Sequence, residues 1–185
     1  MIDLEALVKE YYPKIKEAGL TVETDEATAI EFIKRYPLDM LEDVGEEGIL
    51  TFLLFSVQFS DAVHTDFEGL GYDDFLNILQ NLSLGELSFS NVDISVSDKT
   101  VEKGSGICEV SFQCNGESFN YAAKVNNDWF DTEFMTFVNT IIKKLGKEER
   151  LLVFGDANGI FITYKPPEFI NRFKTIFPMM TIKIA

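Results

Sequence analysis

The pair Asn115-Gly116 constrains the fold more than any other feature, because it lies between two segments in which apolar and polar residues alternate. Asparagine and glycine supply the positive φ angles of a two-residue type I′ turn, which connects the strands of a tight β-hairpin. The turn also fixes the register, so that Phe112 is expected opposite Phe119. We therefore expect a hairpin over residues 106–125 with one apolar face, formed by Cys108, Val110, Phe112, Phe119, Tyr121 and Ala123.

Residues 1–85 are expected to be helical, because their apolar residues recur at helical spacing between capping residues and glycines. Pro13 should kink or break the first of these helices. Residues 39–47 are interpreted as an acidic connector. The apolar stretch 49–63 is interpreted as a helix, although its valine and phenylalanine content leaves a strand as an alternative. The predicted helices are 3–19, 25–36, 49–63 and 72–82.

Residues 86–185 change to an alternation of period two, which indicates a sheet. A bulge is expected near Ser90-Asn91, where the apolar phase switches, and a loop over residues 98–106. The other predicted elements are a helix capped by Asp131 and ended by Gly146, a hairpin over 151–164, a short helix from Pro167 and a last strand over 180–184. The predicted class is α+β, with a helical region (1–85) packed against a mainly antiparallel sheet that carries two further helices (86–185), as one compact unit.

Charge is distributed unevenly along the chain, whose formal net charge is −15. Residues 1–85 contain 18 acidic and 5 basic residues, whereas residues 86–185 contain 13 acidic and 11 basic ones. A field of this sign repels nucleic acid and anionic lipid and accelerates encounter with a basic protein. A well-solvated surface is the alternative interpretation, since acidic residues also favour solubility.

Several function classes are not expected. The longest apolar run, residues 49–59, is far shorter than the roughly 20 residues of a membrane-spanning helix. The first residues lack the basic and apolar regions of a secretory signal, which favours a cytoplasmic location. The two cysteines do not form a zinc or disulfide framework, and no phosphate-binding or dinucleotide-binding glycine motif occurs.

No group of residues forms a recognisable catalytic or cofactor site, so we expect no enzyme activity, cofactor or bound metal. His64, the only histidine, is interpreted as a helix-end residue with ordinary polar contacts rather than as a general base. Cys108 and Cys114 alternate with apolar residues, which indicates inert, buried thiols. The segment 156–159 lacks the later ligands of a calcium loop and is interpreted as a hairpin turn.

Trp129 follows an Asn-Asn-Asp run just before the helix predicted to begin at Asp131. One interpretation is a contact anchor, since tryptophan is enriched in binding hot spots. The other is a hydrophobic staple that closes the corner between strand and helix.

The C-terminal third resembles a known family. The resemblance is carried by Phe119-Asn120-Tyr121, Asp128-Trp129-Phe130-Asp131, Phe137-Val138-Asn139, Arg150-Leu151-Leu152 and Phe161-Ile162-Thr163-Tyr164. Residues 119–177 are similar to the end of certain immunity proteins of bacterial polymorphic toxin systems. The resemblance implies a small acidic protein that blocks a toxin domain by stoichiometric binding, through an acidic patch and without catalytic residues.

The leading hypothesis is therefore a cytoplasmic immunity-type protein that binds a basic protein partner, such as a toxin domain. The candidate contacts are Asp39, Glu42, Asp43, Glu46, Glu47, Asp61, Asp66, Asp73, Asp74 and Trp129. One alternative is a metal-dependent enzyme that uses Asp and Glu side chains in a cleft between the two regions. Another is an accessory or oligomeric module, of which a large apolar surface patch would be the sign.

Overall fold

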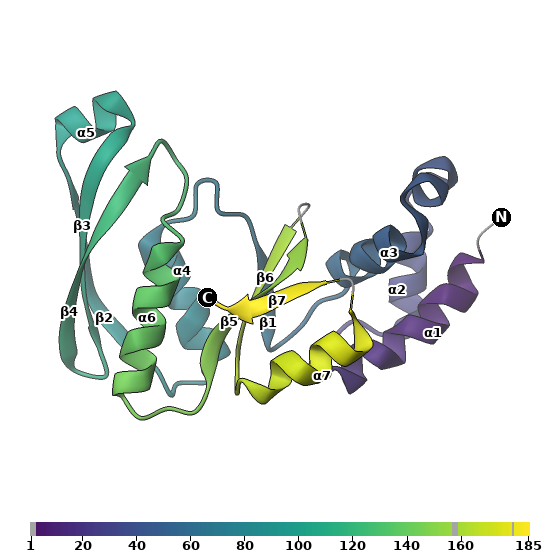
Figure 1. Cartoon of the computed structure of the whole chain (residues 1–185). Coiled ribbons are helices and arrows are strands. Elements are labelled where there is room, and N and C mark those ends of the chain that lie inside the picture. The colour runs from purple at the N-terminus through teal and green to yellow at the C-terminus, as the bar shows by residue number, and fades with distance from the viewer. Residues whose placement is uncertain (1–2, 157–158, 179) are drawn as a thin grey trace.

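The computed structural model has an α+β fold with a four-stranded and a three-stranded antiparallel sheet (Figure 1). It describes residues 3–156, 159–178 and 180–185, apart from the side chains of Leu38, Glu42, Glu46, Glu47 and Asp156. The elements are α1 (Leu4–Glu17), α2 (Glu26–Ile33), α3 (Leu38–Ser56), β1 (Ala62–Thr65), α4 (Tyr72–Leu82), β2 (Phe89–Val96), α5 (Asp98–Lys103), β3 (Ser105–Cys114), β4 (Glu117–Asn126), α6 (Glu133–Lys144), β5 (Arg150–Asp156), β6 (Gly159–Lys165), α7 (Glu168–Ile176) and β7 (Thr181–Ile184).

The elements stack in four layers. The central sheet, in the order β1-β6-β5-β7, has α1, α2, α3 and α7 on one face and α4 and α6 on the other. The sheet β2-β3-β4 covers the far side of α4 and α6 (Figure 1). The continuous apolar run of β5 follows from this position between two cores: Leu152 and Phe154 face the first core, and Leu151 and Val153 face the second.

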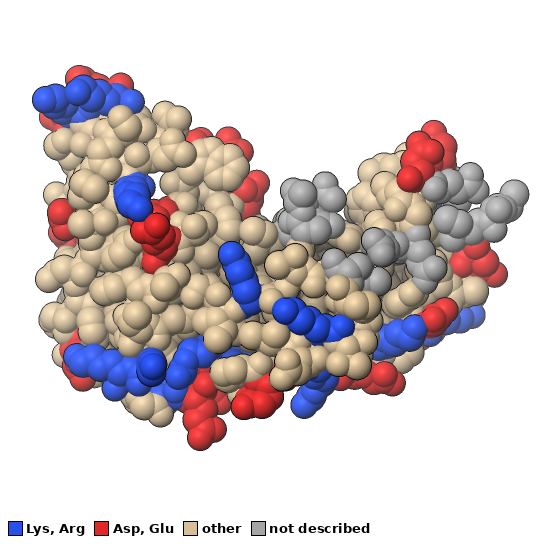
Figure 2. All heavy atoms as spheres, in the orientation of Figure 1, with Lys and Arg blue, Asp and Glu red and all other residues tan. Residues whose placement is uncertain are grey.

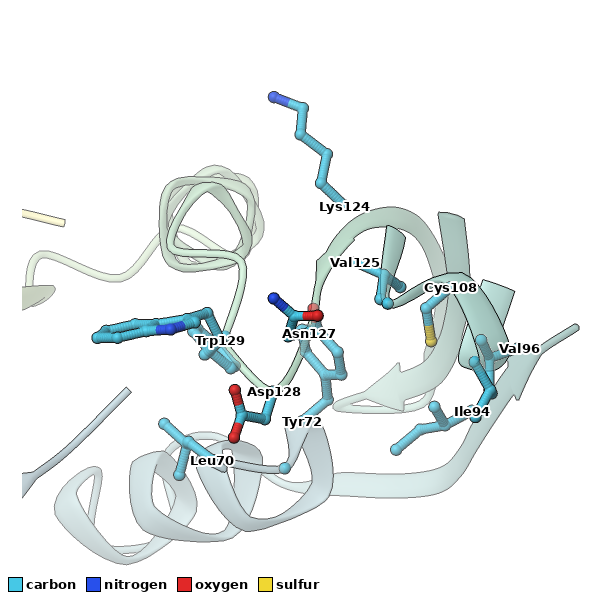
Figure 3. A pocket seen from close by; sticks show the side chains of 14 residues that line it. Leu70, Tyr72, Ile94, Val96, Cys108, Lys124, Val125, Asn127, Asp128 and Trp129 are labelled. Atoms are coloured by element: carbon cyan, nitrogen blue, oxygen red, sulfur yellow. The ribbon is translucent and has the colours of Figure 1, made fainter. Parts of the chain in front are cut away.

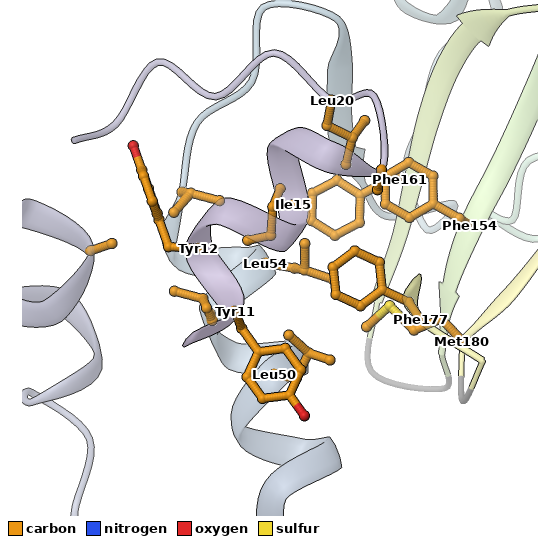
Figure 4. Close-up of a cluster of buried hydrophobic side chains, with 14 of the residues drawn as sticks. Tyr11, Tyr12, Ile15, Leu20, Leu50, Leu54, Phe154, Phe161, Phe177 and Met180 are labelled. Atoms are coloured by element: carbon orange, nitrogen blue, oxygen red, sulfur yellow. The ribbon is translucent and has the colours of Figure 1, made fainter. Parts of the chain in front are cut away.

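The first core joins the beginning and the end of the chain. Residues of α1 and α3 pack against aromatic side chains of β5, β6 and the segment after α7 (Figure 4). The second core contains α4 together with the later elements. The division at residue 85 therefore separates helical from strand-rich sequence but does not separate the two cores.

The predicted β3–β4 hairpin is confirmed residue by residue. Phe112 pairs with Phe119, Val110 with Tyr121 and Cys108 with Ala123, and Asn115 and Gly116 have positive φ angles. The bulge is also confirmed, because the β2–β3 register shifts between Ser90 and Asp93.

Two predictions for the N-terminal helical region are wrong, and a third is wrong in one of its two forms. The break considered at Pro13 does not occur, because a single helix, α1, continues through this residue, with Val8 before it and Ile15 after it fully buried in the same core. The expected acidic connector is the first part of α3, which changes direction at Gly45 (φ 66°). The apolar stretch 49–63 is helical only to Ser56, and β1 then pairs with β6.

The expected loop at 98–106 contains the short helix α5. Its signals are present in the sequence: Ser97 accepts a hydrogen bond from Thr100 N, and Gly104 ends the helix with a φ of 61°. Asp131 lies one residue before the observed cap of α6, Thr132. The turn between β5 and β6 lies partly outside the described residues.

Candidate protein-binding site

The corner between β4 and α6 presents Trp129, and backbone hydrogen bonds fix its shape. Asn127 has a φ of 52° and donates its N–H to Gly104 O at 2.7 Å. The corner is also bonded to the loop before α4, since Gly69 N donates to Asp128 O at 2.7 Å and Phe130 N donates to Phe67 O at 2.8 Å. Two separate segments therefore hold this corner from either side.

Asp131 joins the corner to the sheet. Its carboxylate accepts hydrogen bonds from Lys124 N at 2.8 Å, Tyr121 Oη at 3.1 Å and Glu133 N at 3.1 Å. Burial and the nearby negative charge of Asp131 raise the pKa of Tyr121, which keeps its hydroxyl protonated as the donor. The Asp131 carboxylate thus fixes the end of β4 relative to the start of α6.

Adjacent aromatic residues point in opposite directions at this corner. Phe130 is buried and stacks on Phe67 and Tyr72, with ring centroids 5.9 and 5.0 Å apart. Trp129 is 51% exposed. Phe130, rather than Trp129, is the apolar residue that closes the corner, so the geometry favours the contact-anchor interpretation of Trp129 over the hydrophobic staple.

Trp129 lies at one side of an apolar groove of about 420 Å³ (Figure 3). We call this the Trp129 groove, and its apolar lining includes Leu70, Tyr72, Ile94, Val96, Val101 and Trp129. Burial raises the pKa of Tyr72 to about 12 and also raises that of the Cys108 thiol at the base of the groove, so both groups are neutral near pH 7. The lining is therefore uncharged over most of its area.

Helix α5 and the glycine that ends it also line the groove, through Val101 and Gly104. Gly104 is required there, because a Cβ atom at this left-handed position would collide with Asn127 Oδ1. The close approach brings Val101 to the groove, where its side chain is 63% exposed.

Carboxylates stand around the groove. Asp128 lines it, and its carboxylate lies near Leu70 and Tyr72 (Figure 3). An ideal Cβ on Gly71, another lining residue, would lie 2.6 Å from Asp73 Oδ1 and 3.2 Å from Asp74 Oδ2, so both carboxylates fold back to this edge. They occupy the first turn of α4, where the helix dipole favours negative charge.

The loop before α4 adds two more exposed acids. Asp66 Oδ1 accepts a hydrogen bond from Glu68 N, and Glu68 forms a backbone bridge with Trp129. Within the described residues, none of the five acids of this group forms an ion pair: Asp66, Glu68, Asp73, Asp74 and Asp128. Four of the predicted contacts, Asp66, Asp73, Asp74 and Trp129, are thus brought together.

The remaining predicted contacts lie elsewhere. Asp39 and Asp43 are exposed on α3, across the hollow of the molecule from the corner (Figures 1 and 2). The side chains of Glu42, Glu46 and Glu47 are outside the described part of the structure. Asp61 is engaged within the fold: its carboxylate accepts hydrogen bonds from Thr21 and pairs with Lys165 Nζ at 2.6 Å.

His64 lies in strand β1 rather than at a helix end, and its ring contacts Phe55 and Phe161 with centroids 4.7 and 5.4 Å apart. Cys108 and Cys114 are buried and form no disulfide, as predicted. Among the residues described, no group of three His, Cys, Asp or Glu side chains could hold a metal ion. The described helices also include none that is long and apolar enough to cross a membrane.

The search for similar proteins found no matching family model, curated protein or solved structure. The sequence interpretation missed the groove residues Ile94, Val96 and Val101. Ile94 and Val96 alternate with Asp93 and Ser95 along β2, but nothing in a single strand shows whether a helix covers one of its faces. The caps of α5 were the available signal for the position of Val101.

Proposed function

We propose that this chain is a protein-binding protein of immunity type, which binds a basic partner protein stoichiometrically and blocks it. Its proposed partner is a toxin domain, and its proposed location is the cytoplasm. The observation that supports the proposal best is the exposed Trp129, held on a fixed corner beside an apolar groove and near five carboxylates that form no ion pair with any described residue. Buried aromatic anchors surrounded by polar residues are typical of protein interfaces.

The charge of the chain fits this role. A net charge of −15 attracts a basic domain over long range, and unpaired carboxylates at the contact give the complex its orientation. The resemblance of residues 119–177 to immunity proteins includes Asp128-Trp129-Phe130-Asp131, the same corner that presents Trp129. Asp61 is left out of the proposed contact because its carboxylate is occupied by Thr21 and Lys165.

The test is to co-express the chain with the product of the gene next to it and to measure binding and growth. We expect a one-to-one complex that weakens with salt and relieves the toxicity of the partner. The double variant Asp73→Lys/Asp74→Lys should weaken the complex. The control Glu31→Lys/Glu148→Lys changes the net charge equally at exposed positions far from the groove and should have a much smaller effect.

Circular dichroism of both variants should show folded protein, because a lysine in the first turn of α4 costs only about 0.3–1 kcal/mol. Equal effects of the two double variants would indicate non-specific attraction and count against a defined acidic contact. Absence of both a complex and growth rescue would refute the immunity role.

A further inference from the structure

The three-stranded sheet beside the Trp129 groove is longer than the helices that cover it. Strands β3 and β4 have 10 residues each, which corresponds to roughly 33 Å. Helices α4 and α6 have 11 and 12 residues, or about 17 Å. In Figure 1 the end of the sheet next to α5 extends beyond both helices.

Exposure on the inner face differs between strands. Val110 and Phe112 of the central strand β3 are almost fully buried, whereas Ile94 and Val96 of the edge strand β2, which pair with Val110 and Cys108, are 41% and 40% exposed. Val101 and Trp129 line the same groove. Apolar residues of the inner face of the sheet therefore extend beyond the area that the helices of this chain cover.

The charged residues around the groove determine which charge a binding partner should carry. Among the described lining residues the basic one is Lys124, which points away from the groove (Figure 3) and pairs with Glu133 at 2.9 Å. The unpaired carboxylates of Asp73, Asp74 and Asp128 are left at the edge. A second copy of the chain would bring the same carboxylates together, and an anionic lipid surface would be repelled, whereas lysine or arginine would be attracted.

We infer that the Trp129 groove receives a large apolar side chain from a segment of the partner protein that carries lysine or arginine on both sides of it. The apolar side chain covers Ile94, Val96 and Val101 and packs against Trp129. The flanking cations pair with the carboxylates of the edge. This inference rests on the proposed binding of a basic protein and specifies the chemistry of the contacting segment.

Trp129 is the only tryptophan of the chain, so its fluorescence reports directly on the groove. The probe is a short synthetic peptide with leucine and phenylalanine between pairs of lysines, and the control peptide has serine in place of the two apolar residues. We expect the probe to shift the emission of Trp129 to shorter wavelength with a saturable titration. The control peptide, which has equal charge, should bind at least about tenfold more weakly.

Two matched variants separate the groove from general apolar attraction. Val101→Ser replaces an exposed apolar residue that lines the groove. The affinity for the probe should fall about tenfold, because the complex then buries two methyl groups fewer. Ile107→Ser removes a residue of comparable exposure, 48%, from the neighbouring strand outside the groove, and should leave the affinity unchanged. Both positions are exposed, so both variants should fold.

Equal emission shifts with the two peptides, or equal affinities of the two variants, would overturn the inference. An emission shift that depends on protein concentration without peptide, together with dimers in sedimentation, would assign the groove to a second copy and also overturn it. If a basic partner protein binds normally to Val101→Ser, the proposed function stands and the groove inference fails. If the probe binds as expected but no partner protein does, the inference stands without the immunity role.

Discussion

Replacement of Asp61 by alanine should destabilise the fold rather than weaken partner binding. The carboxylate accepts hydrogen bonds from Thr21 N at 2.8 Å and Thr21 Oγ1 at 2.7 Å, and it pairs with Lys165 Nζ at 2.6 Å. These contacts join the segment after α1 to the end of β6. Asp61 and Lys165 side chains are only 17% and 22% exposed, so solvent competes weakly with the contacts.

The size of the effect can be worked from these contacts. Hydrogen bonds to a charged acceptor contribute about 1.5–3 kcal/mol each when sheltered. Exposed ion pairs contribute roughly 0–1 kcal/mol and fully buried ones about 3–5 kcal/mol when one partner is removed. Because this pair lies between those limits, we expect Asp61→Ala to lower the free energy of unfolding by about 3 kcal/mol. For a chain of this size, that loss corresponds to roughly 6–12 °C in Tm.

The assay is urea unfolding followed by circular dichroism, with a double-mutant cycle between Asp61→Ala and Lys165→Met. The coupling energy should be about 1–2 kcal/mol. Asp66→Ala is the control, since Asp66 is exposed and its carboxylate accepts a single hydrogen bond within the described residues, from Glu68 N. If Asp61→Ala is no more destabilising than Asp66→Ala, or the coupling energy is zero, the assigned structural role of Asp61 is refuted.

Three further predictions concern the cores and the turns. Asn139→Leu should lower the free energy of unfolding, measured in urea, by about 2–4 kcal/mol, because the buried Asn139 amide both donates a hydrogen bond to and accepts one from the backbone of Leu151. A loss no larger than that of a substitution at an exposed position would contradict this prediction. Burial raises the pKa of Cys114 to about 11, so its thiol should react with a disulfide reagent at pH 8 only after unfolding; fast reaction of the native protein would contradict this. Gly104→Ala should destabilise more than Gly116→Ala, since both have positive φ but only the former lacks space for a Cβ atom; equal losses of Tm would show that the close approach is unimportant.

The sequence predicts local structure well where one residue pair or one cap decides it. Asn115-Gly116 fixed the register of ten residue pairs, and Asp25 marked the start of α2. The prediction failed for the stretch 49–63, because apolar residues continue through the end of α3 into β1 and periodicity does not show the change. That change is set by pairing with β6, about a hundred residues further along the chain.

The candidate site was predictable only in part. An acidic segment before and within α4 and a tryptophan at a strand-to-helix corner were visible in the sequence, and Asp66, Asp73, Asp74 and Trp129 do lie together. The internal use of Asp61 could not be predicted, since its partners lie 40 and 104 residues away. The exposure of Ile94 and Val96 depends on their place in an edge strand that the helices leave partly uncovered, which is a property of packing and not of the strand itself.

The division of the four-layer fold between two cores has a consequence for vectorial synthesis. Elements from α4 to α6 are contiguous in the chain and supply most of the second core, so they can associate soon after they leave the ribosome. Helices α1 to α3 emerge first, yet they wait for β5, β6 and α7 to cover their apolar side chains. Helices α1 to α3 therefore complete their core last, and the apolar side chains of α3 stay uncovered during that interval.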